Sequence, residues 1–511
     1  MIFRMKMNNN VTKPERGLRK EEDMLSSLPD DILTKILNCL PINSAAATSV
    51  LSTGWRHLWT GVTNFVVLSQ TGKNNDDDDI LFLQKLIKLS SLKLHNFHIE
   101  LKSLSTFSQI SNFLISNPLT NTLGDQESCF REVCRRDVEN INIFCPDKEN
   151  RYFLLVPDFV FKTKSLVSLT LGCMHIMFDM PENVAIQLPN LKKLYLRHLT
   201  EIPPWLETLC KCSPLLEVLD LEFKLLDIEP RIVNIFAANL KSLRIKSCYS
   251  MVSQTHRNKI LIDAPKLEHL TIIDGSSCYY LTQIPTTLLE ASLDLTITRT
   301  MTETVMVGDD DYRRDMAKFV RRMCNVSKNL HLRLERNSNI IGYLSNGEVN
   351  HGVMFGNLAT LTLNLERFGL IGWENLLLCL QCFPNLKNLV VLYYWPTFWD
   401  PHSNEPPDCL VNKLKKITIF GLFRKTRELE LIAYILSNAT VLEELHIRAP
   451  YRFFKSKEDL LSSGNDVCKS LFELPRASST CVIWFTIDDM VASSNDYKDG
   501  IFRKQRMALE L

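Results

Sequence analysis

The chain has 511 residues, 45% hydrophobic and 23% charged, which is the composition of a globular protein with a sizeable core. Its formal net charge of +1 gives no global attraction to nucleic acid or to an anionic membrane surface. The sequence has no apolar run near the ~18–20 residues that a membrane-spanning helix requires, so we expect neither a membrane nor a nucleic-acid partner.

The first structured element is expected just after a polar leader. Residues 1–22 contain no apolar core of a secretory signal, so we expect them to be disordered. In SLPDDILTKILNCLP, at 27–41, Pro29 suits a first helical turn and Pro41 ends the helix. Between the prolines, apolar side chains recur along one helical face at Ile32, Leu33, Ile36, Leu37 and Leu40.

Two more short helices should complete this N-terminal element. One is expected over residues 43–51, and the other around Trp55 and Trp59. Three helices in such a short stretch bury little surface, and domains of this size usually need a neighbour or a partner. Their excess apolar side chains could therefore face another protein, or they could dock onto the rest of the chain.

Residues 69–89 include the acidic run QTGKNNDDDD, and we interpret them as a linker. The run lacks the ligand spacing of a calcium-binding loop. A repeated leucine phrase follows this linker. The phrase L-x-x-L-x-L begins at 166, 191, 216, 240 and 267, and again at 358, 386, 414 and 442. The intervals of 24 to 28 residues are typical of leucine-rich repeats. Degenerate copies at 293–295 and 330–334 connect the two series.

The repeats predict an α/β fold, a leucine-rich-repeat solenoid over residues 90–450. Each phrase should form a short strand with its leucines inward, and stacking gives the repeats a curved parallel sheet with one shared core. The segments PPWLETLCKCSP, ENLLLCLQCFP and ELELIAYILSNA should return over the convex side as helices. The irregular stretch 296–329 is the expected place for an inserted loop.

The outward positions of these strands are the candidate target-binding surface. Their charges alternate in sign between neighbouring repeats, which favours ion pairs across adjacent strands and also fits a banded surface that selects one protein partner. A uniform positive stripe of the kind that nucleic acid would need is absent from the sequence pattern. The candidate residues are Lys193, Tyr195, Arg197, Asp220, Glu222, Arg244, Lys246 and His269.

Nothing in the sequence predicts catalysis, a cofactor or a metal site. It contains no glycine-rich phosphate loop, nucleophile elbow or HExxH motif. Its one CxxC, Cys379 to Cys382, lies in an apolar helical pattern with no second ligand pair, so we interpret these as buried helix cysteines. Fifteen cysteines spread through such a long chain are typical of reduced thiols, and we expect an intracellular protein of the cytoplasm, the nucleus or both.

The N-terminal motifs resemble a plant-type F-box over about residues 24–68. They are Leu28-Pro29-Asp30-Asp31-Ile32-Leu33, Ile36-Leu37, Leu40-Pro41, Ser49-Val50-Leu51-Ser52 and Trp55-Arg56-His57-Leu58-Trp59. The resemblance implies docking on a Skp-type adaptor and through it on a cullin. The resemblance also implies that Trp55 helps to hold the helical bundle together. The implied adaptor-binding residues are Leu28, Pro29, Ile32, Leu33, Ile36, Leu37, Pro41, Val50, Leu51 and Trp55.

The C-terminal part is similar to the FBD region that accompanies F-boxes and leucine-rich repeats in plants. PPDCLVNKLKKITIFG, ELELIAYILSNATVLEELHI and ELPRASSTCVIWF carry this similarity and suggest that the region continues and caps the solenoid. The expected division is a leader at 1–22, an F-box at 23–68, a linker at 69–89, repeats at 90–450, an overlapping FBD-like region at 404–486 and a loosely ordered tail at 487–511.

The combination implies a non-catalytic, substrate-recruiting subunit of an SCF-type ubiquitin ligase, in which the repeats bind an unidentified target protein. Two alternatives stay open. One is a repeat scaffold whose F-box-like module only caps the solenoid. The other is a sensor in which a small molecule completes the target-binding surface.

Overall fold

The computed structural model describes residues 25, 27–68, 89, 93–100, 129–145, 154–173, 176–179, 185–199, 201–224, 231–248, 258–275, 277–295, 310–333, 355–364, 377, 380–392, 405–420, 426–449, 466–487, 490–493 and 503–504.

The N-terminal helices form where the sequence predicts them. Pro29 and Pro41 occupy the N-cap positions of α1 (Asp30–Leu37) and α2 (Ile42–Ala47). The second predicted helix continues as a short 3-10 turn, η1 (Thr48–Val50), and the third is a 3-10 helix, η2 (Trp55–Gly61). Their shared core consists of Leu33, Leu37, Ile42, Ala45, Ala46, Trp55 and Trp59.

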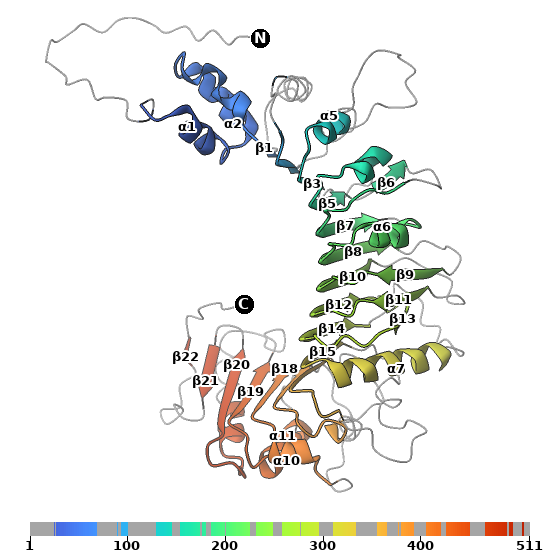
Figure 1. Ribbon diagram of the computed structural model, residues 1–511. Coiled ribbons are helices and arrows are strands. Elements are labelled where there is room, and N and C mark those ends of the chain that lie inside the picture. The colour runs from blue at the N-terminus through green and yellow to red at the C-terminus, as the bar shows by residue number, and fades with distance from the viewer. Residues whose placement is uncertain are drawn as a thin grey trace, which may run out of the picture.

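One long sheet organises the rest of the chain. Its strands pair in chain order, so each repeat contacts only its neighbours, and Figure 1 shows the ladder curving into an arc. The parallel strands are β1 (Asn64–Leu68), β2 (Asn96–Glu100), β3 (Asn140–Cys145), β5 (Ser168–Cys173), β7 (Lys193–Leu199), β8 (Val218–Lys224), β10 (Ser242–Cys248), β12 (His269–Ile273), β14 (Glu290–Asp294), β15 (Asn329–Arg333), β16 (Thr360–Asn364), β17 (Asn388–Leu392), β18 (Lys416–Phe420), β19 (Glu444–Ala449) and β20 (Val482–Ile487).

The predicted curved parallel sheet is thus confirmed. Every full leucine phrase in the sequence overlaps one strand, and the two degenerate copies overlap β14 and β15. The sheet is longer than the expected repeat span, because it starts at β1, directly after η2, and runs on through β20. Two antiparallel strands, β21 (Met490–Ser493) and β22 (Arg503–Lys504), follow β20 within the residues expected to be a loosely ordered tail.

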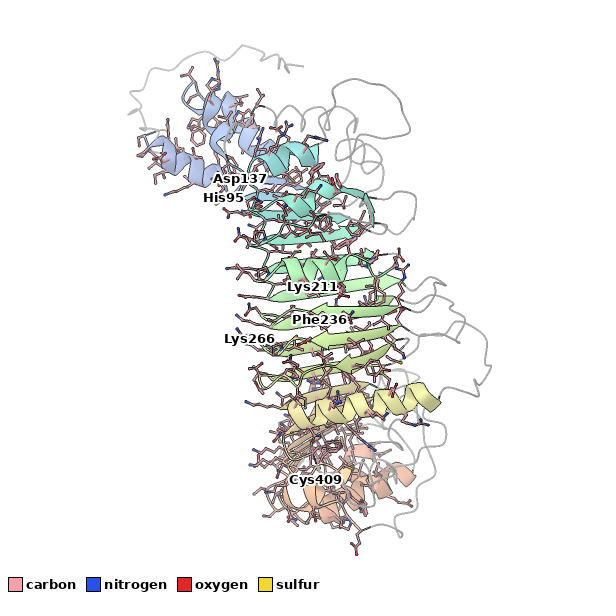
Figure 2. The ribbon with its side chains drawn as sticks, turned by 45° about the vertical axis from the view of Figure 1, so that its right-hand side comes forward. His95, Asp137, Lys211, Phe236, Lys266 and Cys409 are labelled. Atoms are coloured by element: carbon pink, nitrogen blue, oxygen red, sulfur yellow. The ribbon has the colours of Figure 1, made fainter. Side chains whose placement is uncertain are left out.

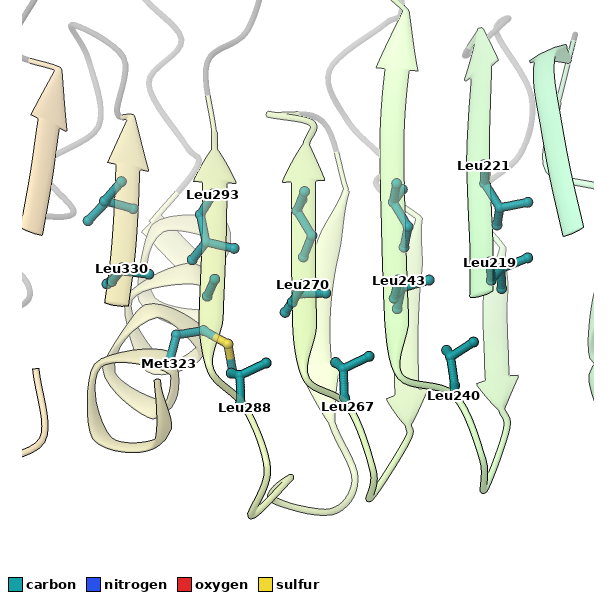
Figure 3. Close-up of a cluster of buried hydrophobic side chains, with 14 of the residues drawn as sticks. Leu219, Leu221, Leu240, Leu243, Leu267, Leu270, Leu288, Leu293, Met323 and Leu330 are labelled. Carbon is teal, nitrogen blue, oxygen red and sulfur yellow. The ribbon is translucent and has the colours of Figure 1, made fainter. Parts of the chain in front are cut away.

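The leucines of consecutive repeats stack into columns behind the sheet. Figure 3 shows this packing from β8 to β15, where buried side chains of each repeat contact those of the next. Fully burying one leucine contributes roughly 1.5–3 kcal/mol, and the repetition makes the core continuous. The labelled members are Leu219, Leu221, Leu240, Leu243, Leu267, Leu270, Leu288, Leu293, Met323 and Leu330.

The convex side is mixed rather than uniformly helical. It carries a small parallel sheet of β9 (Ile232–Phe236), β11 (Lys259–Asp263) and β13 (Cys278–Leu281), and the pair β4 (Leu154–Pro157) and β6 (Ile176–Asp179). Its helical elements are α5 (Cys129–Arg135), η3 (Asp158–Lys162), α6 (Leu206–Cys212), α7 (Asp310–Val326), α10 (Asp408–Asn412) and α11 (Thr426–Asn438). Figure 2 shows Lys211 of α6 near Phe236 of β9, and its ammonium lies 5.8 Å from the ring centroid.

The convex helices partly match their predictions. The segments expected around 203–214 and 428–439 contain α6 and α11, whereas only residues 377 and 380–384 of the third segment are described. The prediction of an inserted loop over 296–329 is wrong for residues 310–326, because these residues form the long helix α7. Its buried face of Met316, Phe319, Val320 and Met323 packs on the solenoid, and the ring centroids of Phe319 and Tyr279 lie 5.8 Å apart.

A chain of asparagines joins the helical module to the sheet. Oδ1 of Asn38, at the end of α1, accepts hydrogen bonds from the backbone N–H groups of Thr63 (2.8 Å) and Asn64 (3.1 Å). The Asn96 amide donates to Asn64, and the Asn140 amide donates to Asn96, each at 2.7 Å across adjacent strands. The rings of Phe65 and Phe97 stack behind this row, so α1 is tied directly to the first repeats.

Candidate protein-interaction surfaces

The helical module presents large apolar side chains to solvent. Val50 and Leu51 are 84% and 66% exposed, and Leu25 is 56% exposed. Ile32 and Ile36, one turn apart on α1, are each 40% exposed. These five are nearly half of the eleven exposed large hydrophobic residues in the described part of the chain, although the module is a small part of it. A concentration of exposed apolar side chains is typical of protein-interaction surfaces.

The predicted adaptor-binding residues divide into surface and core. Four of them, Ile32, Ile36, Val50 and Leu51, are among the exposed side chains above. Pro29 is also exposed, and Leu28 and Pro41 are half-buried. Leu33, Leu37 and Trp55 are 3%, 0% and 7% exposed, so their predicted contact with an adaptor is corrected: they pack inside the module. Leu33 and Leu37 share the inner face of α1, which leaves its outer face to Ile32 and Ile36.

The candidate target-binding residues lie on four adjacent strands of the concave sheet. Lys193, Tyr195 and Arg197 project from β7, and Asp220 and Glu222 project from β8. Arg244 and Lys246 project from β10, and His269 from β12. The structure therefore brings the predicted residues together on one face. Their exposure differs, because Lys193 and His269 are exposed whereas the β8 carboxylates are buried.

The ion pairs expected from the alternating charges are present. Asp220 accepts from Arg197 Nη2 through one oxygen and from Arg244 Nη1 through the other, both at 3.1 Å. Glu222 accepts from Lys246 Nζ at 2.9 Å and lies 3.6 Å from His198 Nδ1. The side chains of Asp220 and Glu222 are only 7% exposed, so the prediction that they contact a target directly is corrected. The two carboxylates hold the longer basic side chains above them.

A β-bulge in β7 shapes this part of the surface. The register between β7 and β8 shifts between Leu196 and Leu199, and His198 adopts a φ of 61°. A non-glycine residue in the left-handed region is uncommon, and bulges often re-aim a side chain near a binding site. Here the bulge turns His198 toward Glu222, next to Arg197. The sequence pattern did not predict the bulge.

The far end of the concave face is aromatic. On β18 and β19, the guanidinium of Arg448 lies 5.1 Å from the ring centroid of Phe420. His446 stacks on Trp484 of β20 with ring centroids 5.9 Å apart. Burial lowers the pKa of His446, which favours a neutral imidazole there. The sequence reasoning did not select Trp484, although its place in the CVIWF segment, in register with His446, marks it as outward.

Several of the described cysteines have the environments of structural thiols. Burial raises the pKa of Cys210, Cys409 and Cys468 to about 12 and that of Cys134 to about 11. Cys382 is half-buried with a raised pKa, and Cys379 lies outside the described residues. Within the described ranges, no three His, Cys, Asp or Glu side chains converge as metal ligands, and no helix has the length and apolarity to cross a bilayer.

Three family matches cover separate parts of the chain, the helical module, the first half of the solenoid and its C-terminal part. The F-box domain family matches residues 25–66, and the FBD family matches residues 402–447. A family described as "FBD-associated F-box protein At5g56370, LRR repeats" matches residues 126–288. The chain therefore has the F-box, leucine-rich-repeat and FBD regions of the plant F-box/FBD/LRR-repeat proteins.

Relatives from Arabidopsis thaliana align with this chain over most of their own length. F-box/LRR-repeat protein At4g14096 is 26% identical over 94% of this chain and 98% of its own length. F-box/FBD/LRR-repeat protein At5g18770 is 22% identical over 93% of this chain and 94% of its own. F-box/LRR-repeat protein At4g14103 is 28% identical over 73% of this chain and 92% of its own.

Proposed function

We propose that this protein is the substrate-recognition subunit of an SCF-type E3 ubiquitin ligase. Residues 23–68 would dock on a Skp-type adaptor and through it on a cullin, and the concave face of the solenoid would bind a target protein inside the cell. The observation that carries this proposal is the exposed apolar surface of the F-box module, where Ile32, Ile36, Val50 and Leu51 remain open after the chain has folded.

In this proposal the chain itself performs no chemistry. Its contribution is proximity, because a target held near the ubiquitin carrier reacts at a raised effective concentration. Two features support that role. The asparagine row from Asn38 to Asn140 ties the module to the sheet. Figure 1 places α1 and α2 at one end of the arc, clear of the concave strands β7 to β15.

The adaptor surface can be tested with substitutions that should leave the fold intact. Val50 is 84% exposed, so Val50→Asp removes no internal contact of consequence. At an interface, the same change would remove about 1.5 kcal/mol of apolar burial and bring a carboxylate into apolar surroundings. We expect Val50→Asp to weaken binding of the full chain to a purified plant Skp-type adaptor at least about 100-fold, measured by calorimetry.

Ile232→Asp is the matched control, because Ile232 is 68% exposed on the convex strand β9, outside the F-box. It should bind the adaptor as the unsubstituted chain does. If Val50→Asp and Ile32→Asp both retain full affinity, the proposed docking surface is wrong. If the unsubstituted chain binds no Skp-type adaptor at all, the protein is instead a repeat scaffold whose helical module caps the solenoid.

A further inference from the structure

The concave surface of β7, β8 and β10 carries an excess of positive charge at solvent level. Four basic side chains project there, Lys193, Arg197, Arg244 and Lys246, above the two carboxylates of Asp220 and Glu222. The side chains of Arg197, Arg244 and Lys246 are 34–39% exposed, whereas both carboxylates are 7% exposed. A partner approaching this basic cluster would therefore meet mainly guanidinium and ammonium groups.

The carboxylates also fix the basic groups in place. Asp220 uses one oxygen for each arginine, so Arg197 and Arg244 are held on either side of the same anchor. Each arginine donates to Asp220 through one guanidinium nitrogen, and a guanidinium group has five donor hydrogens. Arginine forks held in advance bind carboxylates with a smaller loss of side-chain entropy.

The bulge adds to the same cluster. It places His198 beside Arg197, and the Nε of Arg197 is buried without a hydrogen-bond partner among the described residues. Strained backbone of this kind concentrates at binding sites, where the surrounding structure maintains it. The neighbouring outward residues Thr170 and Gly172 on β5 and Thr271 on β12 are uncharged, so they contribute no competing carboxylate.

The size of the cluster limits what it can bind. Strands are about 4.8 Å apart, so β7 and β10 lie on the order of 10 Å from one another across β8. Side chains on one face of an extended peptide recur about every 6.8 Å, so the cluster spans two or three of them. Outward carboxylates return on both sides, at Glu100 of β2 and Glu290 of β14. A longer polyanion such as RNA would meet these negative groups.

We propose that the basic cluster binds a short acidic segment of the target polypeptide, with two or three Asp or Glu side chains facing Lys193, Arg197, Arg244 and Lys246. This inference deepens the proposed function by naming the chemistry of the target at the concave face. It does not depend on whether the F-box binds its adaptor.

The test uses the full chain and a fluorescein-labelled decaglutamate peptide, followed by fluorescence anisotropy. Lys193→Glu is the key variant, because Lys193 is exposed and its replacement leaves both buried carboxylates paired. Lys259→Glu, at an exposed position on the convex strand β11, makes the same charge change away from the cluster. We expect Lys193→Glu to weaken peptide binding at least about fivefold and Lys259→Glu to change it less than about twofold.

A second variant, Arg197→Gln with Arg244→Gln, should weaken peptide binding at least about tenfold, with circular dichroism to verify that the solenoid stays folded. Raising the salt concentration should weaken the binding of the unsubstituted chain. Equal affinity of the Lys193→Glu and Lys259→Glu chains, or no binding of decaglutamate, would overturn the proposal. Tighter binding of a ten-nucleotide RNA than of the peptide would assign the cluster to nucleic acid instead. Failure of adaptor binding alone would refute only the ligase role.

Discussion

Replacing Asn38 with alanine should loosen the connection between the F-box module and the solenoid. Oδ1 of Asn38 accepts two backbone hydrogen bonds, from Thr63 at 2.8 Å and Asn64 at 3.1 Å, and a longer one from the Thr63 hydroxyl at 3.4 Å. Each backbone bond contributes about 1 kcal/mol, and leaving a half-buried donor unsatisfied adds to the loss. We expect the free energy of opening at this junction to fall by about 2–3 kcal/mol.

Hydrogen exchange of the Thr63 and Asn64 amides measures this junction directly, because repeat arrays open locally rather than in one global step. A loss of 2–3 kcal/mol corresponds to roughly 30- to 150-fold faster exchange in the Asn38→Ala chain. Asn38→Asp retains the acceptor oxygen and should keep most of the protection. Unchanged exchange in Asn38→Ala, or equal losses in Asn38→Ala and Asn38→Asp, would refute the reasoning.

Three other predictions concern packing and burial in the solenoid. In Gly172→Ala, the new Cβ would lie 2.6 Å from Cδ2 of Phe144, so we expect about 1–3 kcal/mol of destabilisation in denaturant unfolding. Gly356→Ala is the control and should be tolerated, because the nearest atom to its new Cβ lies 3.8 Å away. Leu243→Ala, in the leucine column, should cost about 2–5 kcal/mol in the same assay, and a loss below 1 kcal/mol would contradict the packing. Burial raises the pKa of the Cys210 and Cys468 thiols from the ordinary 9.0 to about 12, so the folded chain keeps protons that the unfolded chain releases. The contribution of these thiols to stability should be constant below pH 9 and fall between pH 9 and 12, which denaturant unfolding over that pH range would measure. Iodoacetamide should modify the exposed Cys39 before either of them.

The repeats could be predicted because leucine spacing is a direct consequence of stacking. Every repeat must place its leucines in the same column, so the period is readable without any structure. β2 and β3 were missed as repeat strands because they bury phenylalanine and isoleucine in those columns, as Phe97 and Ile141 show. The helix α7 could have been predicted, since Met316, Phe319, Val320 and Met323 recur at helical spacing. The stretch was instead expected to hold an inserted loop because it is irregular relative to the repeats.

The surfaces could be predicted only in part. Periodicity placed Ile32, Leu33, Ile36 and Leu37 on one apolar face, and only packing against η2 and α2 decides which pair is inside. The alternating charges predicted ion pairs between strands, but not the depth of the carboxylates. Asp220 and Glu222 are the shorter side chains, so they lie beneath the basic groups that pair with them. The bulge at His198 depends on local backbone geometry that no residue pattern in β7 specifies.

Deuterium exchange of the full chain with and without a purified Skp-type adaptor would test the central claim most directly. We expect the adaptor to slow exchange in residues 28–52, around Ile32, Ile36, Val50 and Leu51, and to leave the concave strands β7 to β10 unchanged and open to a target. Slowed exchange in β7 to β10 with none in residues 28–52, or no change anywhere at saturating adaptor, would contradict the account.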